Sequence, residues 1–217
     1  MRSYPPPLCP VITSEQVNLT TPYDEDRAGD IRAFLRDKGG KFTRIDIPGA
    51  MGASATRINE RGQIVGIYSE TSPDTQVATD TRGFRFDGGE VTQIDVPGAV
   101  RTQPLGINNH SQIVDEYYDA AGNIHGFLRD SSGHFTTIDI PGAATTSLFG
   151  INDRGQTVGA YAGADGISYG FLWDNGAFTT IDAPGATSFT SYNPLGEGGK
   201  TRFANNGNNM EDDIHAP

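Results

Sequence analysis

The sequence predicts an all-β fold: a small β-propeller of four, or alternatively five, four-stranded antiparallel blades. We expect the N-terminal strand to close the ring. Three observations lead to this class. One motif set recurs with a period of about 44 residues, which is typical of repeat arrays. Each repeat contains four short β-prone runs separated by turn residues, and no stretch has a helical stripe of useful length.

The repeat is defined by three motifs. The first is a small residue followed by Phe, the second is Ile-Asp-x-Pro-Gly-Ala, and the third is Ile-Asn followed by polar residues and Gln. The Phe of the first motif recurs at intervals of 50, 43 and 44 residues, at Phe34, Phe84, Phe127 and Phe171. The second motif begins at Ile45, Ile94, Ile138 and Ile181, and the third at Ile58, Ile107 and Ile151.

The clearest copy shows the strand pattern within one unit. Its β-prone runs cover residues 127–129, 135–138, 147–151 and 156–161, and Asp, Asn, Gly and Pro separate them. Four such strands with this turn chemistry suggest one propeller blade. A β-solenoid is the competing architecture, but its coils are usually shorter than this repeat.

The motifs divide the chain into three parts. Residues 1–31 form an N-terminal extension with a predicted closing strand at 16–20, and residues 32–191 form the repeat propeller. Its units are 32–81, 82–124, 125–168 and the partial unit 169–191. Residues 192–217 lose the pattern and form a degenerate, Asn-rich tail. The array thus begins with the end of a unit and ends with the front of one, a phase offset that lets a propeller close its ring without an open sheet edge.

The order Gly-Phe-Leu-x-Asp, Phe-Thr-x-Ile-Asp-x-Pro-Gly-Ala, Gly-Ile-Asn-x-x-Gly-Gln-x-Val-Gly resembles the bacterial HAF-type extracellular repeat family. The resemblance covers residues 32–191. It implies a secreted or surface protein with propeller-like repeats, and it brings no shared catalytic residues.

Composition limits the functions open to the chain. A net charge of −11 and a pI near 4.6 argue against nucleic-acid binding and against binding to anionic membranes. The single cysteine, Cys9, excludes an intramolecular disulfide and is expected to be incidental. The first residues contain no apolar signal region and the chain has no apolar run of spanning length, so we expect a secreted form to have lost its leader.

Four aspartates recur once per unit directly before x-Pro-Gly: Asp46, Asp95, Asp139 and Asp182. An Asp at such a turn can accept a backbone hydrogen bond and fix the corner. A ring of carboxylates binding a metal on the propeller axis is the alternative. We favour the structural role, because the residue repeats with the fold, and we predict no metal and no cofactor.

Departures from the repeat are the better candidates for chemistry. The second unit has Asp115 and Glu116 where the first has Gly66 and Ile67, and His110 lies nearby in sequence. A carboxylate beside a His could act in acid–base chemistry or hold a cation, but we favour the alternative that these residues are drift on a solvent-exposed strand. Adjacent strand residues point to opposite faces, however, so Asp115 and Glu116 could share a site only across a bulge.

The residue before each Gly/Ala-Phe also varies, and we predict that these residues occupy equivalent points on the blades. They could form a collar that binds an anion or a sugar, or they could be surface residues whose apolar stems cover the fold. Trp173, the only Trp, could stack on a sugar ring. The predicted collar consists of Arg32, Arg82, His125 and Tyr169.

These observations predict a secreted or surface binding and interaction module with a carbohydrate or protein ligand, without membrane insertion, as a monomer or a self-pairing homo-oligomer. One alternative is a hydrolase or lyase using Asp115, Glu116 or His110 in an axial pocket. Another is a structural fragment of a larger repeat array. The sequence contains none of the common catalytic or phosphate-binding motifs.

Overall fold

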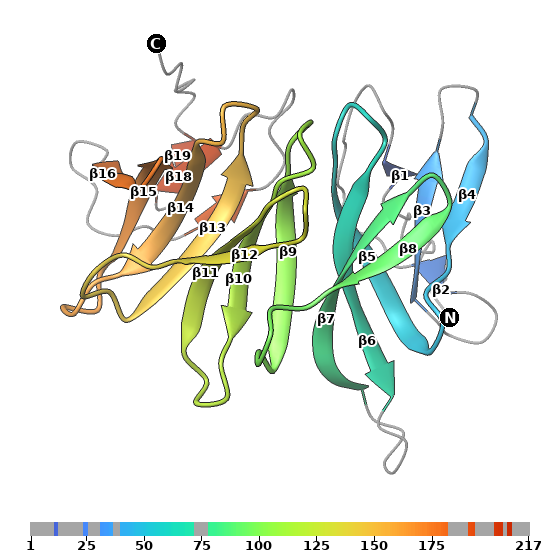
Figure 1. The fold of residues 1–217 in the computed structure, drawn as a ribbon, viewed down its shortest axis with the longest axis horizontal. Coiled ribbons are helices and arrows are strands. Elements are labelled where there is room, and N and C mark those ends of the chain that lie inside the picture. The colour runs from blue at the N-terminus through green and yellow to red at the C-terminus, as the bar shows by residue number, and fades with distance from the viewer. Residues whose placement is uncertain are drawn as a thin grey trace, which may run out of the picture.

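The computed structural model describes residues 11–12, 24–25, 31–36, 40–71, 78–181, 191–193, 202–205 and 208–209. Within these ranges every regular element is a β-strand (Figure 1). No helix that could cross a membrane occurs in the described part of the chain. The predicted closing strand at 16–20, Cys9 and Asp182 lie outside these ranges.

Three consecutive antiparallel runs of four strands in chain order make up the centre of the molecule (Figure 1), and we call them the first, second and third sheets; the second and third are separate, whereas the first is continuous with the N-terminal strands. The first sheet consists of β5 (Ala50–Ile58), β6 (Ile64–Thr71), β7 (Ala78–Asp87) and β8 (Glu90–Ile94). The second consists of β9 (Arg101–Ile107), β10 (Ile113–Tyr118), β11 (Ile124–Arg129) and β12 (Phe135–Ile138). The third consists of β13 (Thr145–Ile151), β14 (Thr157–Ala162), β15 (Ser168–Asp174) and β16 (Ala177–Ile181).

Strands on either side of these sheets belong to further, incomplete blades. At the N-terminal side β3 (Ile31–Arg36) pairs with β4 (Phe42–Ile45) and β2 (Asp24–Glu25), and in parallel with β1 (Val11–Ile12). Ile31 of β3 also pairs in parallel with Gly52 of β5, which joins these strands to the first sheet. The β2–β3 register repeats that of β10–β11 when the two repeats are aligned. At the C-terminal side β17 (Ser191–Asn193), β18 (Arg202–Asn205) and β19 (Asn208–Asn209) form a sheet of their own. Ring closure therefore stays a prediction.

The turns of each sheet lie at the two ends of its strands, and we call these two ends edges. The Pro-Gly turns at 48–49, 97–98 and 141–142, together with the turns between second and third strands, lie at one edge, which we call the Pro-Gly edge. The turns that follow Asn59, Asn108 and Asn152, together with those between third and fourth strands, lie at the other, which we call the Asn edge. A sequence repeat spans the second half of one sheet and the first half of the next.

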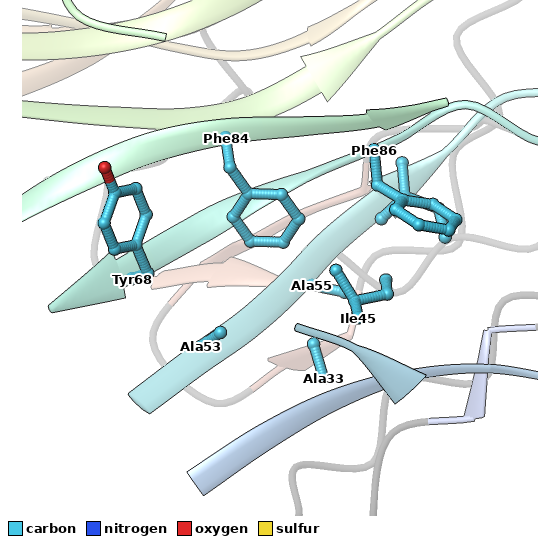
Figure 2. Packing of buried hydrophobic residues seen from close by; sticks show 8 residues of the cluster. Ala33, Ile45, Ala53, Ala55, Tyr68, Phe84 and Phe86 are labelled. Carbon is cyan, nitrogen blue, oxygen red and sulfur yellow. The ribbon is translucent and has the colours of Figure 1, made fainter. Parts of the chain in front are cut away.

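The hydrophobic core lies between neighbouring sheets and explains two of the three motifs. In each interface the Ile of Ile-Asp-x-Pro-Gly-Ala packs against the same cluster as the Phe on the third strand of the following sheet. Figure 2 shows the first such interface, with Ile45 and Phe84 in one cluster. Ile94 with Phe127, and Ile138 with Phe171, repeat this arrangement. All three Phe side chains are fully buried, and each contributes roughly 1.5–3 kcal/mol by leaving water.

The Asn motif links the sheets at the Asn edge. The Asn59 side-chain oxygen accepts the backbone N–H of Arg61 and of Gln63 within its own turn, at 3.1 and 3.0 Å. Its Nδ2 donates to Gln63 and to the backbone carbonyl of Asn108 in the next sheet, at 2.7 and 2.8 Å. Asn108 donates in the same way to the carbonyl of Asn152, at 3.0 Å. The predicted turn role of this Asn is thus joined by a link between sheets.

The first strand of each sheet carries one extra residue. Val114 pairs with Gly106 but Asp115 pairs with Pro104, which leaves Leu105 unpaired. The first and third sheets have the same irregularity one repeat away. Such a bulge increases the local twist of the strand and leaves one residue out of the ladder.

Candidate binding site

The predicted collar residues occupy equivalent positions at the Pro-Gly edge. In the three complete sheets this residue lies near the start of the third strand, directly opposite a tyrosine on the second strand. The cross-strand pairs are Tyr68 with Arg82, Tyr117 with His125, and Tyr161 with Tyr169. The backbone of Arg32 on β3 pairs with Asp24 in the equivalent register, and its side chain lies outside the described part of the structure.

In the first sheet Arg82 lies between two carboxylates. Its Nη1 donates to Asp95 at 2.9 Å and its Nε donates to Glu70 at 3.3 Å. About a third of each side chain is exposed, so these ion pairs are accessible from solvent and contribute little to stability. Burial, followed by the charges of Glu70 and Asp95, raises the pKa of the neighbouring Tyr68 to about 12.

The second sheet repeats this arrangement with His125 in the central position. Its Nδ1 lies 2.8 Å from Asp139 and its Nε2 lies 3.5 Å from Asp119. Its ring stacks on Tyr117 with centroids 5.1 Å apart. Partial burial opposes the charge on His125, but the hydrogen bonds and charges of Asp139 and Asp119 outweigh burial and raise its pKa. Hydrogen bonds from Asn123 hold the pKa of Asp119 at about 2.

The third sheet has an aromatic pair at this place. Tyr169 stacks on Tyr161 at 5.3 Å and donates its hydroxyl to Asp165 at 2.7 Å. Trp173 lies four residues further along the same strand, roughly 13 Å away, near the Asn edge. It packs on the cluster of Phe171 and Leu148. The structure therefore joins Arg82, His125 and Tyr169 in one pattern and separates Trp173 from it.

The repeated aspartates are paired within their own units. Asp46 bonds to Arg44, Asp95 to Arg82 and Asp139 to His125. No group of three or more His, Cys, Asp or Glu side chains within the described ranges could hold a metal ion. The described aspartates thus bring a carboxylate to the collar positions of the first two complete sheets.

Asp115 is fully buried in the interface between the first and second sheets. Its neighbours in the pairing are Phe127 and Pro104, and neither carboxyl oxygen has a hydrogen-bond partner among the described residues. Burial, followed by the charge of Glu116, raises its pKa well above the ordinary value.

The other two complete sheets have Gly at this position, and there a Cβ would meet an obstacle. It would lie 2.2 Å from the backbone oxygen of Ser54 at Gly66, and 2.1 Å from that of Ser147 at Gly159. In the first and third sheets only glycine fits at the position that Asp115 occupies in the second sheet.

Glu116 faces the other way, toward the third sheet. It accepts hydrogen bonds from Ser147 of β13 and from Tyr118, the latter at 3.2 Å. Gln103, with its amide oriented to suit its neighbours, donates to Glu116 at 3.0 Å and accepts from Arg101 at 2.8 Å. Arg101 also lies over the ring of Tyr118, 5.2 Å from its centroid. This polar cluster is half-exposed and lies close to the Pro-Gly edge of the second sheet.

Sequence reasoning found only Glu116 of this polar cluster. The available signal was departure from the repeat, since Tyr118 replaces Ser69 and Ala162, and Arg101 replaces Gly52 and Thr145. His110 lies in an exposed turn at the Asn edge. The three residues considered for acid–base chemistry, Asp115, Glu116 and His110, are therefore directed to two different interfaces and to the opposite edge.

The fold is similar to known β-propellers. TolB from Acinetobacter baumannii superposes with a TM-score of 0.53 at 12% identity, covering 81% of this chain and 43% of that chain. The β-propeller domain of the Trilobed protease from Pyrococcus furiosus gives 0.48 at 13% identity, covering 76% and 47%. A fucose lectin from Kordia zhangzhouensis gives 0.34 at 15% identity, covering 61% and 99%.

The chain spans less than half the length of the first two structures. No protein-family model matches it, and no curated protein matches it. At these identities the likeness concerns the fold alone. Together with the four-stranded antiparallel sheets, it confirms the predicted class: this chain has a β-propeller fold.

Proposed function

We propose that the chain is a binding module whose ligand lies against the Pro-Gly edge. The observation that carries this proposal is the repetition of one arrangement in successive sheets. A tyrosine lies against a cationic or aromatic collar residue, and carboxylates flank that residue. These side chains are part-exposed, so their polar atoms can exchange partners with a ligand.

A carbohydrate is the ligand class that this chemistry favours. Side-chain carboxyl groups such as that of Asp139 accept hydrogen bonds from hydroxyl groups, and the Tyr117–His125 stack offers an aromatic surface. The half-exposed cluster around Glu116 adds further donors and acceptors at the same edge. Equivalent sites on several sheets would favour a polymer over a single sugar, because linked sites raise the apparent affinity.

The resemblance to HAF-type extracellular repeats supports a secreted or cell-surface location for the protein. The acidic surface fits a soluble ligand without nucleic-acid character. A protein ligand is the second candidate, since rigid β-propeller edges also suit a polypeptide loop with basic or hydroxyl side chains.

A binding isotherm against a panel of glycans and soluble polysaccharides tests the proposal. We expect saturable binding to at least one polymer, weakened about tenfold or more by His125→Ala. The matched control is His134→Ala, which removes a histidine from an exposed turn at the Asn edge and is expected to bind as the unaltered protein does. Flat isotherms across the panel would refute the carbohydrate ligand, and equal losses in the two variants would refute the Pro-Gly edge as its site.

A further inference from the structure

The interface between the first and second sheets contains two arginines that neither the repeat nor the proposed binding site uses. Arg85 lies on β7 and Arg129 on β11. They stand at different repeat positions, so comparing the units in sequence does not pair them. The question is whether the fold brings them together.

The strand pairings show that both side chains enter the same interface. Arg85 is directly opposite Val65, and Arg129 is directly opposite Ile113. Val65 and Ile113 both belong to the buried cluster between the first two sheets. Directly paired residues share a face of a sheet, so the two guanidinium groups approach each other from opposite sides near the Asn edge.

The corresponding places in the neighbouring interfaces are apolar. The interface before it has Leu35 and Phe86 in its cluster, and the interface after it has Leu128 and Trp173. An aliphatic–aromatic pair therefore satisfies the fold at this point. Of the three interfaces, only the one between the first and second sheets has two arginines in place of that pair.

The arginines leave buried donors without partners. Arg85 Nε and Arg129 Nη1 are buried and have no hydrogen-bond partner in the described part of the structure. Arg85 Nη2 lies 3.9 Å from Asp87, and Arg129 lies over the ring of Phe135 at 5.8 Å. Burial, followed by the charge of Arg85, lowers the pKa of Arg129, which only the charge of Asp130 opposes.

We propose that Arg85 and Arg129 form a binding site for a small oxyanion, a phosphate or sulfate group that is free or part of an ester. An oxyanion between the two guanidinium groups would accept hydrogen bonds from the unpartnered donors and cancel the repulsion between like charges. The planar fork of arginine matches the geometry of such groups. The site lies at the Asn edge and is independent of the ligand proposed for the Pro-Gly edge.

Thermal unfolding in sulfate and in chloride at matched ionic strength tests this site. For the unaltered chain we expect the midpoint to rise with the logarithm of the sulfate or phosphate concentration in the millimolar range, by roughly 5–10 °C at a hundredfold excess over Kd. Isothermal titration with inorganic sulfate should show one site. A rise that is linear in salt concentration, without saturable heat in the titration, would indicate general exclusion of the salt and overturn the proposal.

The double variant Arg85→Leu/Arg129→Trp copies the pair found between the second and third sheets, and we expect it to fold and to lose the sulfate response. Arg85→Gln/Arg129→Gln, which keeps polar side chains of shorter length, gives the same test if that variant does not fold. Arg154→Gln removes an exposed arginine from the same edge and should keep the full response. An unchanged response in either double variant would overturn the assignment.

Discussion

Replacing Asp115 by Gly should make the protein more stable. The change restores the residue that the first and third sheets have at this point, and it removes a buried carboxyl group without a described partner. Leaving such a group unsatisfied costs about 1–3 kcal/mol, whereas a glycine within a strand costs about 0.5–1 kcal/mol. The net gain before ionisation is therefore about 0–2.5 kcal/mol.

The gain should depend on pH, because the folded state raises the pKa of Asp115. The contribution of a carboxyl group with a raised pKa is fully present below its unfolded pKa of about 4, and it is lost as pH rises toward the folded value. In that window the unaltered protein loses up to about 1.4 kcal/mol per pH unit relative to the glycine variant. Near neutral pH the variant should therefore melt roughly 4–8 °C higher.

The assay is urea unfolding of both proteins at about pH 4.5 and about pH 7.5. Asp115→Asn serves as the control, because it keeps the size and a polar group but cannot ionise. We expect it to remove the pH dependence without the full gain in stability. A glycine variant that is no more stable than the unaltered protein, or a difference that does not grow with pH, would refute the reasoning.

Three further changes give measurable outcomes. Asn108→Ala removes the bonds to Gln112 and to the Asn152 carbonyl and should cost about 2–3 kcal/mol in urea unfolding; a loss under about 0.5 kcal/mol would show that the link between sheets is unimportant. Gly159→Ala places a Cβ 2.1 Å from a backbone oxygen and should cost about 3 kcal/mol or prevent folding, which a normal melting midpoint would contradict. The pKa of His125, followed by NMR, should lie above about 6.5 and fall in Asp139→Asn, because the neighbouring carboxylate raises it. The stability that the His125–Asp139 pair contributes should be lost as pH rises through that pKa. An unchanged titration in the variant would remove Asp139 as the cause.

Much of the fold could be predicted because the repeat motifs are the contacts between sheets. The equivalents of Ile94 and Phe127 recur in every unit, because each interface buries one such Ile and one such Phe. The collar positions also follow from the repeat, because equal positions in equal units become equal positions in space. The partners of these residues did not follow, since Asp119 and Asp165 stand at different positions in turns that have the same backbone hydrogen bonds.

The paired arginines could not be found in the same way. An interface joins one face of a sheet to the opposite face of the next, so residues that meet across it stand at different repeat positions. Arg85 aligns with Leu128, and Arg129 aligns with Phe86. Their meeting depends on which strand residues face forward and which face backward, and on which sheets are neighbours, and the alignment of repeats contains neither.

The Asn links also have a direction. Asn59 donates forward to the unit that follows it, and the carbonyl of Asn108 receives that bond while its own side chain donates forward again. The unit that contains Asn108 therefore carries one outgoing donor and one incoming acceptor of the same chemistry. A second copy of this unit inserted next to it would therefore find both of these Asn connections already matched.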